Sequence, residues 1–211
     1  KRMDRNIIYA DLLSCGDFIQ YNNSCNSKQL LDEIKEFEWI KYNPRKDVKR
    51  YGLSVTSSDG TRNGVDLDSL YELSKEQGKI YDEDNFTTLT DVYHKSKEVQ
   101  KLVDPWKPWL CRTHFLNFKK GGYFPPHIDS YKFGEQKFIR LIVPIKKCNP
   151  SFLYFVYEDK LLNFNRGYTY FLNTNKKHTI FSFSDDSTML VMNIKCCKES
   201  IEQIHNLLLW K

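Results

Sequence analysis

The segment CRTHFLNFKKGGYFPPHIDSYKFGEQKFIR (Cys111–Arg140) is the part of the sequence that decides the expected fold. At its centre, His127 and Asp129 follow a Pro-Pro pair and stand two positions apart. If the segment is extended, residues i and i+2 project from the same face of a sheet, so an imidazole and a carboxylate would share one space. Such a pair is two-thirds of the 2-His-1-carboxylate arrangement that holds Fe(II) with open coordination positions. The spacing therefore predicts a metal site that needs one further ligand.

Short apolar or alternating runs separated by turn residues fill the C-terminal half of the chain. Gly121-Gly122 and Gly134 are examples of these turn residues. The runs are Trp109–Phe118, Phe138–Ile145, Phe152–Tyr157, Lys160–Phe164, Tyr168–Leu172, Thr179–Phe183 and Thr188–Lys195. Short strands at this spacing are typical of a sandwich or jelly roll. A double-stranded β-helix, which is a cupin-like jelly roll, is therefore expected here.

Helical periodicity and capping signals dominate the first hundred residues and return at the C-terminus. The expected helices run from Ser27 to about Phe37, from a cap at Asp66 through Gln77 to a stop at Gly78, over Thr90–Leu102 and over Glu199–Trp210. A short strand is expected at Asn6–Leu13. The expected fold class is α+β, with a helix-rich part (1–108) that packs on a β core with a C-terminal helix (109–211), all within one structural domain.

Composition restricts the class of protein. A chain of 211 residues is long enough for one sizeable core. The net charge of +5, from 32 basic and 27 acidic residues, is only mildly basic, so it does not favour nucleic-acid binding and does not exclude it. Six cysteines without a CxxC spacing predict reduced thiols in a cytoplasmic protein. No apolar run reaches transmembrane length, so no membrane partner is expected.

The missing metal ligand has to come from another of the five histidines. His94 and His205 fall on expected helices and are interpreted as surface or packing residues. His178 opens a late strand, 49 residues after Asp129 (178 − 129). In a jelly roll, two such positions can meet across the mouth of the barrel. His178 is therefore the predicted third ligand, and His114, on the strand before the Gly-Gly turn, is the second candidate.

Three successive blocks of the sequence resemble the aspartyl/asparaginyl β-hydroxylase family, which includes bacterial free-proline hydroxylases. The blocks are RTHFLNFKKGGYFPPHIDS, FIRLIVPI and NRGYTYFLNTNKKHTIFSFSDDSTMLVMNI, and together they cover about Arg112–Ile194, less than half of the chain. The resemblance implies a double-stranded β-helix that uses Fe(II), 2-oxoglutarate and dioxygen. It implies that His127, Asp129 and His178 bind the iron and that Arg140 helps to hold the co-substrate.

One position departs from the family pattern. The family usually has an arginine ten residues after the last histidine, where it pairs with the distal carboxylate of 2-oxoglutarate, and this chain has Thr188 there. A hydroxyl cannot replace the charge of a guanidinium that forks onto a carboxylate. Three accounts stay open. Another cation, such as Arg112, Arg140 or Lys195, supplies the charge; Thr188 and tyrosine hydroxyls anchor the co-substrate; or the protein does not use 2-oxoglutarate.

The resemblance also implies a class of activity, namely an Fe(II)- and 2-oxoglutarate-dependent dioxygenase that hydroxylates an amino-acid or protein side chain. Its partners would be dioxygen and an amino-acid, peptide or protein substrate. Competing hypotheses are a jelly-roll metal protein that does not use 2-oxoglutarate, a degenerate binding module, and a nucleic-acid-modifying oxygenase. The charge run KYNPRKDVKRY (Lys41–Tyr51) predicts a solvated loop, with a role in substrate capture as the alternative.

Overall fold

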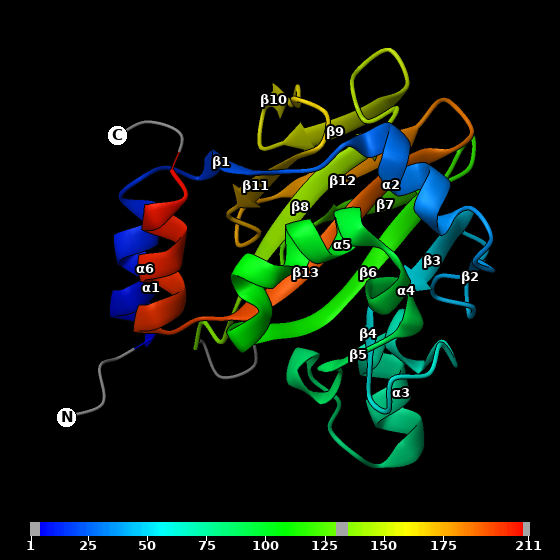
Figure 1. The fold of residues 1–211 in the computed structure, drawn as a ribbon, viewed down its shortest axis with the longest axis horizontal. Coiled ribbons are helices and arrows are strands. Elements are labelled where there is room, and N and C mark those ends of the chain that lie inside the picture. Colours follow the sequence, from blue (N-terminus) through cyan, green and yellow to red (C-terminus); the bar gives the residue numbers. More distant parts are fainter. Residues whose placement is uncertain (1–4, 130–134, 209–211) are drawn as a thin grey trace.

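Two antiparallel sheets stacked face to face form the centre of the protein in the computed structural model, which describes residues 5–129 and 135–208 (Figure 1). The larger sheet has seven strands in the order β1 (Phe18–Ser24), β11 (Tyr168–Leu172), β8 (Phe138–Lys146), β13 (Ser187–Lys195), β6 (Leu110–Phe118), β3 (Arg50–Ser54) and β2 (Ile40–Lys41). The smaller sheet has the order β10 (Lys160–Leu161), β9 (Leu153–Tyr157), β12 (His178–Ser182) and β7 (Tyr123–His127). A separate two-stranded ribbon pairs β4 (Thr56–Ser57) with β5 (Thr88–Leu89).

The connections between the two sheets are those of a jelly roll. From β6 onward the chain passes repeatedly from one sheet to the other, with β6, β8, β11 and β13 in the larger sheet and β7, β9, β10 and β12 in the smaller one. This is the double-stranded β-helix expected from the spacing of the strand signals. Helices and antiparallel sheets occur together, so the α+β jelly-roll fold class is confirmed.

The alternation of side chains along β13 divides the core into two parts. Met189 and Val191 point between the sheets, into an apolar cluster shared with β8, β9 and β12. Leu190 and Met192 point to the opposite face and pack under the helices. Because both faces of this strand are covered, its residues are buried almost without interruption, as is typical of central strands.

The helices cover the outer face and one end of the larger sheet (Figure 1). They are α1 (Arg5–Leu13), α2 (Ser27–Ile34), α3 (Leu70–Gln77), α4 (Asp91–Lys95), α5 (Lys97–Val103) and α6 (Lys198–Asn206), with 3₁₀ turns η1 (Val65–Leu67), η2 (Glu83–Asn85) and η3 (Asp104–Trp109). Helices α1 and α6 lie side by side although they come from opposite ends of the sequence. Within the described residues, no helix combines the length and apolarity needed to cross a membrane.

The N-terminal region also contributes strands to the larger sheet. β1 pairs with β11 at one edge, and β3 pairs with β6 near the other. In the second pairing Arg50 lies opposite Phe118 and Ser54 lies opposite His114, so these β3 side chains share the face that β6 turns towards the smaller sheet. Residues 1–108 therefore help to build the walls around the interior.

The strand expected at Asn6–Leu13 is wrong, because residues 5–13 form helix α1. The buried residues of this helix are Ile8, Tyr9 and Leu12. Leu12 stands four positions after Ile8 and three after Tyr9, so all three lie on one face of a helix. In a short apolar run this helical pattern is easily mistaken for a strand, and packing of α1 against α6 settles which one forms.

Three helix boundaries differ from their expected positions. Asn26, not Ser27, caps α2, accepting hydrogen bonds from the backbone N–H groups of Lys28 and Gln29. That helix ends at Ile34 instead of near Phe37. Asp66 lies in the 3₁₀ turn η1, and the residue that caps α3 is Ser69. The stop at Gly78 is confirmed, since this glycine adopts the left-handed conformation that ends many helices (φ +60°).

The helix expected over Thr90–Leu102 is interrupted at Ser96. Thr90 caps α4 as its position suggests, but Ser96 is extended (φ −118°, ψ 116°), so it ends α4 and caps α5 by accepting a hydrogen bond from Val99 N–H. The hydroxyl of Ser96 also donates to the carboxylate of Glu33 on α2. This contact between distant segments stabilises a break that the local pattern does not show.

The strand expectations are largely confirmed. The run Lys160–Phe164 forms a strand only over Lys160–Leu161, and β7 is an additional strand. The turn at Gly134 and residues 209 and 210 of the helix expected over Glu199–Trp210 lie outside the described residues. Within them this helix, α6, ends earlier than expected, at Asn206. All six cysteines are free thiols, as their spacing predicts.

Gly122, in the turn that leads into β7, is a test of this packing. A Cβ atom there would lie 2.6 Å from the carbonyl oxygen of Lys49 and 2.9 Å from that of Lys119, and neither backbone oxygen can move freely. Gly122→Ala is expected to lower the free energy of unfolding by about 1–3 kcal/mol through overpacking. Gly78→Ala is the control, since its Cβ would meet nothing within 4 Å and only its φ is unfavourable. Urea denaturation showing equal stability for the two variants would contradict this description of the turn.

Candidate metal site and adjoining cavity

The three side chains predicted as ligands come together at the edge between β7 and β12. His127 ends β7, and His178 opens β12 directly opposite it, because the two residues are register partners in this antiparallel pair. Their imidazole centroids are 4.3 Å apart, and Nε2 of His127 lies 3.6 Å from Oδ1 of Asp129. One donor atom from each of the three residues lies within 4.8 Å of the others. Two imidazole nitrogens and a carboxylate oxygen form a donor set that suits a divalent transition metal.

Backbone carbonyls orient both imidazole rings. Nδ1 of His127 lies 2.7 Å from the carbonyl oxygen of Pro125, and Nδ1 of His178 lies 2.9 Å from that of Lys176. A carbonyl only accepts hydrogen bonds, so each Nδ1 carries the proton and each Nε2 keeps its lone pair. Burial lowers the pKa of His178, which favours the neutral form that binds a metal. The pair therefore has the tautomer and orientation that ligation requires.

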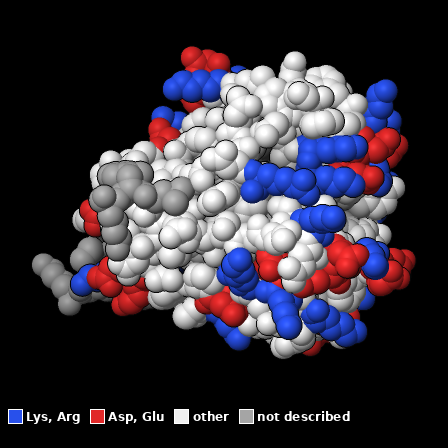
Figure 2. Space-filling view, turned by 45° about the horizontal axis from the view of Figure 1, so that its top comes forward, with Lys and Arg blue, Asp and Glu red and all other residues white. Residues whose placement is uncertain are grey.

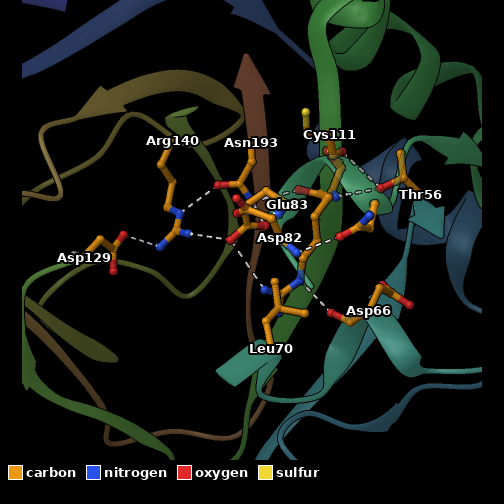
Figure 3. A network of polar contacts seen from close by, with 12 residues as sticks. Thr56, Asp66, Leu70, Asp82, Glu83, Cys111, Asp129, Arg140 and Asn193 are labelled. Carbon is orange, nitrogen blue, oxygen red and sulfur yellow. Dashed lines mark hydrogen bonds and ion pairs between the residues drawn. The ribbon is translucent and has the colours of Figure 1, made fainter. Parts of the chain in front are cut away.

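Arg140 holds the carboxylate of Asp129 (Figure 3). Its Nη1 donates to Oδ2 of Asp129, and its Nε donates to Oδ1 of Asn193 at 3.0 Å. Its Nη2 lies 3.4 Å from Oε1 of Glu83, which belongs to η2 of the N-terminal region. Burial by itself raises the pKa of Asp129, but Arg140 and the neighbouring imidazoles outweigh it and hold this pKa below its ordinary value. The carboxylate is thus kept charged and oriented.

A cavity between the two sheets, with a volume of about 570 Å³ including its opening to solvent, adjoins these side chains. Its wall is mainly apolar, with a few polar groups, a composition common in small-molecule sites. The apolar part consists of Leu116, Phe124, Ile142, Phe155, Leu172, Ile180, Met189 and Val191, and the polar part of Tyr42, Arg112, His114, His127, Arg140, Thr174 and His178.

Two of the predicted co-substrate residues, Arg112 and Arg140, line this cavity. The Arg112 side chain is buried, and its Nε donates to the carbonyl oxygen of Asp66 at 2.6 Å. Its Nη2 donates to the hydroxyl of Tyr42 at 3.0 Å, and its Nη1 lies 3.6 Å from Oε1 of Glu83. Glu83 therefore lies between both arginines. In the described chain, these two are the permanently charged cations that line the cavity.

Thr188 and Lys195, the other residues considered for the co-substrate, do not line the cavity. The hydroxyl of Thr188 accepts a hydrogen bond from Nδ2 of Asn117 at 2.9 Å, and the register of β13 shifts between Thr188 and Met189. Lys195 is exposed at the end of the same strand. The alternative ligand His114 lines the cavity with its Nδ1 unpaired, but it is not part of the converging donor set, and His94 and His205 lie on α4 and α6.

Sequence reasoning missed Glu83 and Arg50. Glu83 gave no signal, because its link to Arg112 and Arg140 joins segments far apart in the chain. Arg50 stands within the charge run Lys41–Tyr51, which predicts a solvated loop, yet it is the first residue of β3 and only 3% exposed.

No protein-family model and no curated protein matches the sequence. Solved structures do match the fold. A Burkholderia pseudomallei oxidoreductase of the 2OG-Fe(II) oxygenase family is similar over 94% of this chain and 93% of its own, with 9% identity and a TM-score of 0.57. A prolyl-4-hydroxylase from Pseudomonas putida is similar over 92% of this chain and 98% of its own, with 10% identity and a TM-score of 0.46. At such identities the likeness establishes the fold alone, and only the first similarity is strong enough to support it.

If the converging donors bind a metal, removal of His178 should abolish binding. Titration of the purified protein with Co(II), followed by visible absorption and calorimetry, is expected to show one site in the parent protein. His178→Ala should weaken the affinity at least about 10–100-fold, since it removes a ligand and not merely a supporting residue. His205→Ala, on α6, is the matched control and should bind Co(II) normally. Equal affinity in both variants would exclude His178 as a ligand.

Proposed function

We propose that this protein is an Fe(II)- and 2-oxoglutarate-dependent dioxygenase that hydroxylates an amino-acid or protein side chain. The observation that carries the proposal is the convergence of His127, Asp129 and His178 beside an apolar cavity in a jelly roll. A 2-His-1-carboxylate set with open positions is characteristic of non-haem Fe(II) oxygenases. The fold likeness to the Burkholderia oxygenase is consistent with this assignment.

Each element of the site has a separate task in this proposal. His127, Asp129 and His178 would hold the iron, and the carbonyls of Pro125 and Lys176 keep the imidazole rings in their ligating orientation. Fe(II) and 2-oxoglutarate supply the oxidising chemistry when they are bound. The protein orients the reacting groups, and the apolar side chains between the sheets exclude water from them.

Arg112 and Arg140 are the residues proposed to hold 2-oxoglutarate. Arg112 lies on β6 and Arg140 on β8, and both side chains line the cavity. Glu83 lies between them, 3.6 Å from Arg112 and 3.4 Å from Arg140. Their guanidinium groups can fork onto a carboxylate, which Thr188 cannot do and for which Thr188 is badly placed. Of the three accounts of Thr188, we therefore propose that another cavity cation supplies the charge.

The type of reaction rests on the resemblance to aspartyl/asparaginyl β-hydroxylases. That resemblance covers Arg112–Ile194, which includes the donor set and both arginines. Hydroxylation of an unactivated carbon in an amino-acid, peptide or protein substrate is the reaction that follows from it. Figure 2 shows Lys and Arg bordered by Asp and Glu on the visible face, with no continuous basic stripe, so a nucleic-acid substrate gains no support there.

A jelly-roll metal protein that does not use 2-oxoglutarate is the second candidate. It is favoured by the position ten residues after His178, where Thr188 carries no charge and turns its hydroxyl to Asn117. The degenerate binding module differs from both candidates, because it would not bind iron at all.

Anaerobic addition of Fe(II) and 2-oxoglutarate distinguishes these functions. The proposed dioxygenase should develop a weak visible charge-transfer band, because 2-oxoglutarate chelates the iron through its carboxylate and keto oxygens. His127→Ala should lack the band, whereas His94→Ala, altered at an exposed position of helix α4, should keep it.

Iron binding without the band would favour the second candidate, and absence of iron binding would favour the binding module. Either result would contradict the proposed function.

A further inference from the structure

Arg50 is a buried arginine without an acidic partner. Its side chain is 3% exposed, and its Nε and Nη1 atoms have no hydrogen-bond partner. Among the described residues, no Asp or Glu lies within ion-pair distance of it. Unpaired buried charges are rare because removing an ion from water costs several kcal/mol. Such a group in a folded protein suggests a partner that the isolated chain does not contain.

Among the described residues, two aromatic rings lie against the Arg50 guanidinium. Its guanidinium carbon lies 3.5 Å from the centre of the Phe124 ring and 5.2 Å from that of Tyr42. Cation–π contacts stabilise the charge by about 0.5–2 kcal/mol but accept none of the in-plane N–H groups. Burial lowers the pKa of Arg50 to about 10, so it stays charged at neutral pH. The guanidinium therefore stays charged, with two of its three nitrogens unpaired.

This guanidinium borders an open hollow next to the metal donor set. The hollow has a volume of about 990 Å³, including its opening, and shares Tyr42, Arg112, Phe124 and His127 with the cavity between the sheets. Arg50 lines the hollow and not the cavity. A molecule bound there would contact Arg50 at one end and approach the ligand His127 at the other.

The charges around the hollow are unbalanced. Its two carboxylates are already engaged, Asp68 by Arg45 at 2.8 and 3.0 Å, and Glu83 by Arg112 and Arg140. Arg50 adds a further positive charge for which the hollow contains no matching carboxylate. The hollow is therefore complementary to an anion, and a planar carboxylate fits the guanidinium fork best.

We propose that Arg50 binds a carboxylate of the substrate, so that the substrate is an amino acid or peptide carrying a free acid group. The inference rests on the proposed function for identifying this acid as the molecule to be hydroxylated. Arg50 lines the hollow and not the cavity, whereas Arg140 lines the cavity and not the hollow, and Arg112 lines both. The acid at Arg50 and the co-substrate at Arg140 would therefore be held by different cations.

Calorimetry on the full chain loaded with redox-inert Zn(II) and saturated with 2-oxoglutarate tests the proposal without turnover. The probes are the α-amide of N-acetyl-L-aspartate, which carries one carboxylate, and its uncharged analogue, the α-amide of N-acetyl-L-asparagine. The parent protein should bind the acid at least tenfold more tightly than the amide, since a charge-assisted hydrogen bond contributes about 1.5–3 kcal/mol. Arg50→Met should remove this preference, and Arg50→Lys should keep part of it.

Thermal melting without ligand distinguishes acid binding from a structural role. Arg50→Met should melt at the same temperature as the parent protein or higher, because it replaces an unpaired buried charge by an apolar chain of similar length. Arg62→Met is the control, since Arg62 lies over Phe37 but pairs with Asp91. It should leave the preference for the acid unchanged and should not raise the melting temperature.

Three results would overturn the proposal. They are equal affinity of the parent protein for acid and amide, an unchanged preference in Arg50→Met, and a loss of 2-oxoglutarate affinity in Arg50→Met with normal aspartate binding. The last would assign Arg50 to the co-substrate. An intact acid preference in a protein that lacks the Fe(II)–2-oxoglutarate band would instead reject the proposed function and leave the acid site standing.

Discussion

The antiparallel pairing of β12 with β7 is the interaction on which the candidate site depends. It sets His178 opposite His127, although the two residues are 51 positions apart in the sequence (178 − 127). Side chains alternate along a strand, so a shift of the β7–β12 register by one residue would turn one imidazole to the opposite face of the sheet. The three donor atoms would then no longer converge. The register is fixed on the other side of β12 as well, where five consecutive residues pair with β9.

Around this strand pair, distant parts of the chain contribute one function each. The jelly roll supplies the metal donors and the apolar cavity, and Arg140 on β8 orients Asp129. The N-terminal region supplies Glu83, which lies between the two cavity arginines, and Arg50, which faces the outer hollow. In the proposal, co-substrate and substrate occupy adjoining spaces that share Arg112, with Arg140 lining only the first and Arg50 only the second.

Much of the β core and the donor set could be predicted from the sequence because both rest on local patterns. Alternating runs gave the strands, and the two-residue spacing of His127 and Asp129 gave two of the converging side chains. Contacts between distant segments were not predictable in this way. Ser96 interrupts an expected helix because it bonds to Glu33, and Arg50 is buried in a charge run because Phe124 and Tyr42 cover it. Tertiary packing decides whether a charged side chain in such a run is exposed to water or covered by aromatic rings.

The central claim is that His127, Asp129 and His178 bind a single metal ion. Anomalous diffraction from crystals grown with Mn(II), a redox-stable substitute for Fe(II), tests it most directly. We expect one strong peak about 2.0–2.3 Å from Nε2 of both histidines and from a carboxylate oxygen of Asp129, as for first-row metals bound by nitrogen and oxygen. A peak that His178 does not contact, or no peak at this position, would contradict the account.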